Sequence, residues 1–493
     1  MNITDLSIAQ LRDKIQKKEV TAVQVTDAFL KRIKELDPKL NSFITINDKA
    51  LDDAKAIDQK LSAGEKVGPL AGMPLAIKDM LCTKGIKTTA ASKILGNFIP
   101  PYDSTVVARL KRAGGIVIGK TNLDEFAMGS SNETSYFGPV KNPWNLGCVP
   151  GGSSGGSAAA QAARLAVASI GTDTGGSIRQ PASFCGVVGI KPTYGRVSRY
   201  GIVAYASSLD QAGPMTSTVA DAAEMLEVIS GHDGHDSTTT QKPVPAFTKS
   251  LRKDLKGFKI GLIREYDTDA VSDDVRKTVQ QAIEAAKSLG AEIVEVKVPL
   301  TQYAVPIYYL VAASEASSNL ARYDGVRFGF RADFHNLSAV ELEKFYCQNR
   351  GQGFGEEVQR RIMIGTYALS SGYYDAYYNK AGQVRRLLTE QFQKAFDSCD
   401  VILSPVSTTP AFKLAERISD PLAMYLNDIF TTSTNLAGLP GMSVPYGFSG
   451  EGLPIGVQLT AAHFNEEKLF SVASALEIVA NISERRPNVT SWL

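Results

Sequence analysis

Apolar residues near the start of the chain recur at spacings of three and four positions. The recurring positions are Leu6, Ile8, Leu11 and Ile15, followed by Val23, Val25, Phe29 and Ile33. Such spacing places the apolar side chains on one face of a helix. We therefore predict two amphipathic helices between Asp5 and about Leu36, within a helical arm over residues 1–60 that packs onto the main body.

Beyond the arm, short apolar runs alternate with segments of helical periodicity. The apolar runs begin at Pro74, Ile116, Leu165, Lys259, Ile293 and Val401. The helical segments are Val106–Ala113, a small-residue stretch from Ser157, Val219–Ile229 and Val275–Leu289. Alternation of this kind is typical of layered α/β proteins. The pattern predicts an α/β core in which one sheet runs through most of the chain.

Two segments depart from this alternation. Residues 232–247 are rich in Asp, Thr, Gly and Pro and have no apolar periodicity, which predicts a surface loop. Residues 308–378 are helical in pattern and rich in aromatic side chains, without a strand signal. This second segment is predicted to be an inserted helical cap.

Composition narrows the class of protein. Hydrophobic residues make up 44% and charged residues 21% of the 493 positions, and Lys plus Arg exceed Asp plus Glu by only +2, without blocks of like charge. The five cysteines form no C-x-x-C pair, so neither a disulfide framework nor a zinc site is indicated, and we expect no metal. The N-terminus lacks the pattern of a secretory signal, and no apolar run is long enough to span a bilayer. We expect a soluble, cytoplasmic protein without membrane contact.

Two clusters of glycine and serine are the strongest chemical signal. The first is Pro150–Ser157, and the second is Gly171–Arg179 after an Ala-rich helical stretch and an apolar run. Either cluster alone also fits a flexible turn, because Gly and Ser are common loop residues. A glycine-rich backbone that leads into a serine at a helix start, however, supplies converging N–H groups for a tetrahedral oxyanion. The pair of clusters favours a serine nucleophile.

A serine nucleophile needs a base. The chain has four histidines, namely His232, His235, His335 and His463, and none stands in a catalytic context. Metal binding by the two in the polar loop is less favoured than a solvated turn. Lys78 ends the apolar run Pro74–Lys78, where burial would lower its pKa and make it a base. The alternative is an ordinary solvated lysine or one paired with Asp79.

A competing motif occurs at Gly114–Thr121, which satisfies the G-x-x-x-x-G-K-[ST] pattern of phosphate-binding loops. Three β-branched residues, Ile116, Val117 and Ile118, lie inside the motif and predict a strand there. A phosphate loop instead follows a strand and presents bare backbone amides. Nucleotide binding through Lys120 therefore stays the less favoured alternative, from another class of protein.

The chain resembles the amidase signature family over nearly its whole length. The resemblance rests on Lys78, on Gly-Gly-Ser-Ser-Gly-Gly at 151–156 and on Gly-Thr-Asp-Thr-Gly-Gly-Ser-Ile-Arg at 171–179, in this order and spacing. It implies one α/β/α domain over residues 1–493, with a mixed central sheet flanked by helices. It also implies a cis peptide bond before Ser153.

The same resemblance assigns the catalytic roles. Ser177 corresponds to the nucleophile, Ser153 to the bridging serine and Lys78 to the base, which together form a Ser-Ser-Lys triad. The corresponding oxyanion hole is formed by the backbone of Thr174, Gly175, Gly176 and Ser177.

Within the family, further segments are similar to the branch that supplies ammonia to tRNA-dependent amidotransferases. These segments are 121–130, 142–144, 313–319, 360–363, 369–375 and 427–428. The resemblance implies that Arg361 holds the carboxylate and Asp428 the ammonium group of free glutamine. It implies no cofactor in this chain, a heterotrimer with B and C subunits, and ATP and Mg used by a partner that acts on Glu-tRNA(Gln). A free-standing amidase with another amide substrate is the alternative. Whether the complex also acts on Asp-tRNA(Asn) stays open.

Overall fold

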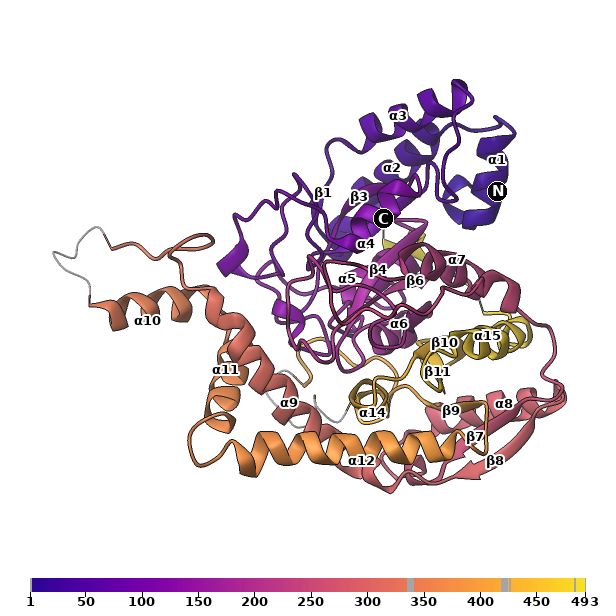
Figure 1. Cartoon of the computed structure of the whole chain (residues 1–493). Helices are drawn as coiled ribbons and strands as arrows, with labels where there is room; N and C mark the ends of the chain where they lie inside the picture. Colours follow the sequence, from indigo (N-terminus) through magenta and orange to yellow (C-terminus); the bar gives the residue numbers. More distant parts are fainter. Residues whose placement is uncertain (1, 335–340, 418–423, 425–426, 483–484, 493) are drawn as a thin grey trace.

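A mixed sheet forms the centre of the molecule (Figure 1). The computed structural model describes residues 2–334, 341–417, 424, 427–482 and 485–492. Among these residues eleven strands form one sheet in the order β1-β3-β2-β4-β6-β5-β10-β11-β9-β7-β8. The pairs β2–β3, β2–β4, β7–β8 and β7–β9 are parallel, and the other pairs are antiparallel. The predicted α/β fold with a mixed central sheet is confirmed.

Most predicted apolar runs are strands. The strands are β1 Phe43–Ile46, β2 Pro74–Lys78, β3 Ile116–Thr121, β4 Ala168–Asp173, β5 Val188–Lys191, β6 Gln211–Thr216, β7 Lys259–Ile263, β8 Glu292–Val296, β9 Val401–Pro405, β10 Gly441–Phe448 and β11 Pro454–Ala461. The run predicted from Leu165 becomes a strand only at Ala168. Five strands, β1, β5, β6, β10 and β11, were not predicted from the sequence.

Helices flank the sheet in two groups. They are α1 Ile8–Gln16, α2 Ala22–Leu40, α3 Ala50–Ser62, α4 Thr105–Arg112, α5 Gly155–Ala162, α6 Arg179–Cys185, α7 Val219–Ile229, α8 Asp273–Ser288, α9 Ala304–Asn319, α10 Leu342–Gly353, α11 Glu356–Ala368, α12 Lys380–Ala395, α14 Thr432–Leu436 and α15 Glu466–Ala480. Helices α5 and α6 contact each other and the sheet, whereas α4, α7, α15 and α8 contact one another in series. None of the described helices contains a stretch that is both long and apolar enough to cross a bilayer.

The N-terminal arm contains the two predicted amphipathic helices. Ser7 and Thr21 cap α1 and α2, and each forms a reciprocal capping box with a glutamine three residues later. The apolar faces of both helices are buried, and a third helix, α3, follows (Figure 1, indigo). The predicted end of the arm at residue 60 falls within α3, which continues to Ser62. The boundary of the arm therefore stays a prediction.

The predicted cap segment is helical throughout most of its described residues. It contains most of α9 together with α10 and α11, and residues 335–340 lie outside the described part. Helix α9 packs against α11 and α12, whereas α10 extends away from the body at the left of Figure 1. The loop at 232–247 contains no helix or strand before a short 3-10 turn that begins at Phe247, as predicted.

The phosphate-loop alternative does not fit this fold. Lys120 lies in β3 with 0% of its side chain exposed. Its Nζ atom donates to the Leu81 carbonyl at 2.8 Å and to the Thr88 hydroxyl at 2.7 Å, and lies 3.4 Å from Asp79 Oδ1. Because a buried ammonium with three protein partners cannot reach a nucleotide phosphate, the motif is part of a core strand.

Candidate active site

Lys78 and the second glycine-serine cluster meet at one edge of the sheet. Lys78 ends β2, which pairs in parallel with β4, so that Ile77 lies opposite Ile170. The Gly171–Arg179 cluster follows from the carboxyl end of β4 into α6, and carries Ser177 between them. Because parallel strands end at the same edge of a sheet, the two segments are brought together. Ser153 comes from the loop before α5.

Lys78 is fully buried among hydroxyl groups. Its Nζ atom lies 2.8 Å from Ser153 Oγ, 2.8 Å from Ser154 Oγ and 2.9 Å from Thr172 Oγ1. Burial lowers the pKa of Lys78 to about 7, although the charges of Asp124, Asp173 and Asp210 act in the opposite direction. A large fraction of Lys78 is therefore a neutral amine near pH 7, which can accept a proton from a hydroxyl.

The backbone ties the two serine loops together. The Gly152–Ser153 peptide bond is cis, as the family resemblance implied. Ser154 donates its backbone N–H to the Ser177 carbonyl at 3.1 Å, and Gly152 donates to Gln180 Oε1 at 2.9 Å. Ser177 is 7% exposed, and within the described residues its hydroxyl forms no hydrogen bond. The hydrogen bond between Lys78 and Ser153 is thus formed, whereas the described residues show none between Ser153 and the Ser177 hydroxyl.

The loop from Thr174 to Ser177 requires its two glycines. Gly176 has a φ of +142°, which L side chains rarely adopt, and a Cβ atom there would lie 2.3 Å from Thr431 Oγ1. A Cβ atom on Gly175 would lie 2.5 Å from the ring of Tyr308. The Gly176 N–H donates to Asp173 Oδ1 at 2.9 Å, so this amide is already engaged. The remaining amides of the loop stay predictions for the oxyanion hole.

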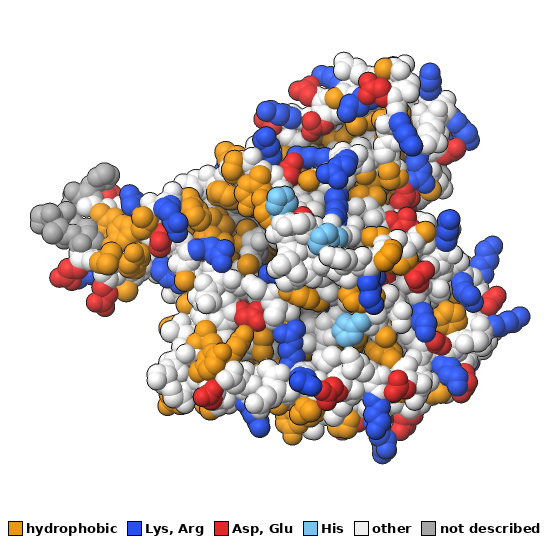
Figure 2. All heavy atoms as spheres, in the orientation of Figure 1, with side chains coloured by type: hydrophobic (Ala, Val, Ile, Leu, Met, Phe, Trp, Pro, Cys, Tyr) orange, Lys and Arg blue, Asp and Glu red, His pale blue; other side chains and the backbone are white. Residues whose placement is uncertain are grey.

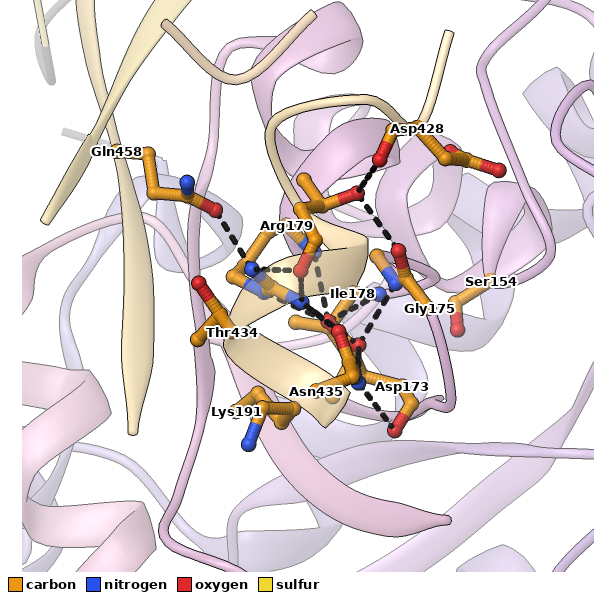
Figure 3. A network of polar contacts seen from close by, with 12 residues as sticks. Ser154, Asp173, Gly175, Ile178, Arg179, Lys191, Asp428, Thr434, Asn435 and Gln458 are labelled. Carbon is orange, nitrogen blue, oxygen red and sulfur yellow. Dashed lines mark hydrogen bonds and ion pairs between the residues drawn. The ribbon is translucent and has the colours of Figure 1, made fainter. Parts of the chain in front are cut away.

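A buried ion pair between Asp173 and Arg179 contacts this loop (Figure 3). Arg179 Nε and Nη2 donate to the two carboxylate oxygens of Asp173 at 3.0 and 3.1 Å, and both side chains are 0% exposed. Asn435 donates to Asp173 Oδ1 at 2.8 Å, and Gln458 accepts from Arg179 at 2.6 Å. Burial alone would raise the pKa of Asp173, but the charge and hydrogen bonds of Arg179 outweigh it and lower that pKa to about 2. Asp173 is therefore a fixed negative charge.

A cavity of about 260 Å³ is lined in part by Ser130, whose carbonyl accepts a hydrogen bond from Gln180 at the start of α6, and its described lining includes no residue of the two glycine-serine clusters. Ser130, Ser131, Gly355, Arg360 and Arg361 are among the residues that line it. The cavity thus lies between the loop after β3 and the N-terminal half of α11.

The two residues predicted to bind substrate charges both belong to this region. Arg361 is 2% exposed and lines the cavity, where it donates to Glu357 Oε1 at 2.8 Å and to the Tyr205 hydroxyl at 2.6 Å. Asp428 accepts a hydrogen bond at 2.6 Å from Ser130, which also lines the cavity. Burial raises the pKa of Asp428 to about 7, while the Ser130 hydrogen bond and the charge of Arg361 lower it. Arg361 of α11 thus lines the cavity, whereas Asp428, from the segment before α14, is not among the described lining residues and contacts Ser130, which is one of them.

A family model for amidases matches residues 24–470 of this chain. The chain belongs to the amidase family. Two curated relatives are named as the A subunit of glutamyl-tRNA(Gln) amidotransferase: one from Bdellovibrio bacteriovorus is 66% identical over 99% of this chain and 100% of the relative, and one from Geobacter metallireducens is 57% identical over 97% and 98%.

Solved structures of amidase family members have the same fold. The A subunit of glutamyl-tRNA(Gln) amidotransferase from Thermotoga maritima, known from a crystal structure, is 42% identical, with a TM-score of 0.80 over 99% of both chains. The native peptide amidase from Stenotrophomonas maltophilia is 32% identical, with a TM-score of 0.81 over 98% of both chains. The predicted family is confirmed.

Sequence reasoning missed several polar residues of this amidase site. Ser154 and Thr172 contact Lys78 directly, and Asp173 holds the Gly176 amide. All three stand in or beside the two glycine-serine clusters, so that the motifs contained them without indicating their contacts. Thr431 and Asn435 lie far along the chain, where no motif marked them.

The described histidines have other partners. His232 Nδ1 lies 3.2 Å from the Thr239 hydroxyl, His235 stacks on Tyr200 at 4.6 Å between ring centroids, and His463 Nε2 lies 2.8 Å from the Ala437 carbonyl. His335 lies outside the described residues. Within the described ranges, no group of three or more His, Cys, Asp or Glu side chains could hold a metal ion.

Proposed function

We propose that this chain is the glutamine-hydrolysing A subunit of a glutamyl-tRNA(Gln) amidotransferase (EC 6.3.5.7). It hydrolyses glutamine and supplies the ammonia that converts Glu-tRNA(Gln) to Gln-tRNA(Gln). The observation that carries this proposal is the buried 2.8 Å contact between Lys78 Nζ and Ser153 Oγ, beside the loop that bears Ser177. The names of the relatives support the choice of substrate and of the larger reaction.

The chemistry is acyl transfer through a Ser-Ser-Lys triad. Neutral Lys78 accepts the proton of Ser153, which in turn accepts the proton of Ser177, while Ser177 Oγ attacks the side-chain amide carbon of glutamine. The amides of the 174–177 loop other than that of Gly176, which binds Asp173, stabilise the oxyanion. The C–N bond then breaks, and the relay returns the proton to the leaving nitrogen, which departs as ammonia. Water attacks the resulting γ-glutamyl ester with the help of the same relay, and releases glutamate and the Ser177 hydroxyl.

The substrate cavity suits the two charges of a free amino acid. We assign the α-carboxylate of glutamine to Arg361 and its α-ammonium group to Asp428. A guanidinium group pairs well with a carboxylate, and a buried carboxyl group that gains an ammonium partner ionises more readily. This opposed pair distinguishes free glutamine from amides that lack the two charges.

The partners are inferred from the names of the relatives, which describe a subunit of a larger enzyme. B and C subunits complete a heterotrimer in the cytoplasm, the B subunit uses ATP and Mg to activate Glu-tRNA(Gln), and this chain needs no cofactor of its own. On the face drawn in Figure 2, Lys and Arg side chains are interspersed with Asp and Glu, and the net charge is only +2. Because few phosphates could be neutralised by such a surface, the chain reaches tRNA through the complex. Residues 1–493 are proposed as one domain, with an arm over 1–60 and a cap over 308–378.

The decisive experiment uses the chain co-purified with its B and C partners. The complex should hydrolyse glutamine faster than the chain alone, and Ser177→Ala should abolish this hydrolysis. The Ser177→Ala complex should still amidate Glu-tRNA(Gln) when free ammonia is supplied, because only the ammonia source is lost.

Two other results would favour the rival functions. Hydrolysis of other amides in place of glutamine, by a chain that acts without partners, would identify a free-standing amidase. ATP binding to the isolated chain that Lys120→Ala abolishes would support the nucleotide-binding alternative.

A further inference from the structure

Thr431 connects the loop 174–177, which bears Ser177, to the turn that carries Asp428. It lies just before α14, is 0% exposed, and donates its hydroxyl to the Gly175 carbonyl at 2.6 Å. The same hydroxyl lies 3.2 Å from the Asp428 carbonyl. Figure 3 labels the two residues that Thr431 connects, Gly175 and Asp428.

We propose that Thr431 is a positioning residue that fixes the Gly175–Gly176 peptide and couples the oxyanion loop to the turn bearing Asp428. This inference rests on the proposed function, because it assigns the loop to the oxyanion and Asp428 to the ammonium group of glutamine. It adds a role for a residue that touches neither the reacting atoms nor the substrate charges.

The peptide between the two glycines is held at both ends. Thr431 Oγ1 binds its carbonyl oxygen at 2.6 Å, and Asp173 Oδ1 accepts its N–H at 2.9 Å. Two glycines in succession allow the peptide plane to rotate at low cost, because no Cβ atom restricts it. Rotation would also move the following amide, that of Ser177, away from the position where negative charge develops. Donors of an oxyanion hole must be oriented before the reaction.

The turn that carries Thr431 is itself held by several hydrogen bonds. The Asp428 carbonyl accepts the N–H groups of Thr431 and Thr432, both at 3.1 Å, and the Thr431 carbonyl accepts two N–H groups of Arg179 at 3.2 Å each. Thr431 therefore contacts Asp428, Gly175 and Arg179 of the buried ion pair. A substrate held by Asp428 is thus placed at a defined position relative to the amides of the loop.

Thr432 provides a matched control in the same turn. It is also 0% exposed, and its hydroxyl donates to the Asp428 carbonyl at 3.0 Å. Among the described residues, this hydroxyl makes no hydrogen bond to the oxyanion loop. Thr431→Val and Thr432→Val each remove one buried hydroxyl at nearly constant volume, so both should destabilise the fold to a similar extent. They differ in the contact with Gly175.

The test measures glutamine hydrolysis by complexes that contain Thr431→Val, Thr431→Ser or Thr432→Val. Inhibition by the glutamine analogue that carries a boronic acid in place of the side-chain amide is measured too, because Ser177 Oγ adds to the boron and forms a tetrahedral adduct that needs the oxyanion donors. Glutamate, which forms no such adduct, reports ground-state binding. Thermal melting of each complex checks folding, and Thr431→Ala is a second way to remove the hydroxyl if the valine variant does not fold.

We expect Thr431→Val to lower kcat by about 10- to 100-fold, somewhat less than the loss of a direct oxyanion donor. Affinity for the boronic acid should fall by a similar factor, while KM and glutamate affinity change by less than about twofold, because ground-state binding does not use the oxyanion donors. Thr431→Ser should recover most of kcat, and Thr432→Val should lose much less of it.

Equal losses in the two valine variants would overturn the proposal. So would a loss in Thr431→Val that appears in KM and glutamate affinity rather than in kcat and boronic-acid affinity. A wild-type complex that does not hydrolyse glutamine would instead refute the proposed function, and with it the role of Thr431.

Discussion

Lys78 Nζ lies 2.8 Å from Ser153 Oγ, and both side chains are completely buried. Lys120, on the neighbouring strand β3, is equally buried but lies 3.4 Å from the carboxylate of Asp79. The neighbours of Lys78 are hydroxyls and a carbonyl rather than a paired carboxylate. One buried lysine is therefore suited to accept a proton, whereas the other is half of an ion pair.

Replacement of Lys78 by arginine tests its role as the base. A guanidinium group keeps the positive charge but does not lose its proton in a protein, so it cannot accept the proton from Ser153. Lys78→Arg should therefore lose as much glutaminase activity as Lys78→Ala, on the order of 100- to 10,000-fold.

Steric misfit of arginine could imitate this loss. The control is a comparison of thermal melting for the wild type and both variants. A well-folded Lys78→Arg complex that hydrolyses glutamine within about tenfold of the wild-type rate would refute the mechanism, given the usual size of general-base effects.

The pH dependence of glutamine hydrolysis should report the same group. Burial lowers the pKa of Lys78 to about 7, and the active form is the neutral amine that exists above this value. The pKa of Asp428 is raised to about 7 by burial, and its ionised form also exists above it. Both effects have the same sign, so kcat/KM should rise with pH through about 7.

The profile of kcat separates the two groups. In the complex with substrate, an ammonium group beside Asp428 would lower its pKa, so the acid limb of kcat reports mainly Lys78. The measurement is steady-state hydrolysis on both sides of the pKa of about 7. Values of kcat and kcat/KM that do not change across this range would argue against a neutral lysine base.

Arg361 and Asp428 should govern glutamine binding more than the chemistry. Alanine at either position should cost about 2 to 5 kcal/mol in kcat/KM, because each would remove a buried partner of a substrate charge. Reaction with a small amide that lacks both charges should survive in the variants, since the triad is intact.

Arg360 offers a control for this prediction. It lines the same cavity, but its side chain is 42% exposed and pairs with Glu357. Arg360→Ala should leave glutamine kinetics near the wild-type values. If Arg361→Ala behaves like Arg360→Ala, Arg361 does not bind the substrate.

Lys120 should matter for stability rather than for ligand binding. Lys120→Met would leave Asp79 buried without its cationic partner, at a cost of about 3 to 5 kcal/mol in the free energy of unfolding. Lys259 and Glu292 form a pair at the same distance of 3.4 Å, but both side chains are more than half exposed. Lys259→Met should therefore cost about 1 kcal/mol or less in the same denaturation experiment. Similar losses in the two variants would contradict the importance of burial.

The sequence predicted elements well where one face of an element is buried. Helix α7 has the predicted bounds Val219–Ile229, because its apolar spacing repeats over three turns. Strands β10 and β11 were missed, since their residues are mostly buried and no alternation of polar and apolar residues marks them. Both also contain Gly and Pro, which by local pattern indicate turns.

The family and the glycine-serine loops could be read from the sequence alone, because tight backbone conformations require glycine at defined local positions. The distant groups that complete the site depend on how the chain folds. Thr431 accepts hydrogen bonds from Arg179 across 252 residues of chain, and the pKa of Lys78 depends on the burial that strands and loops impose together. Local patterns report the conformation of neighbouring residues. The electrostatic environment of a buried group depends instead on residues that are distant in the sequence and that the folded sheet and its loops bring around it.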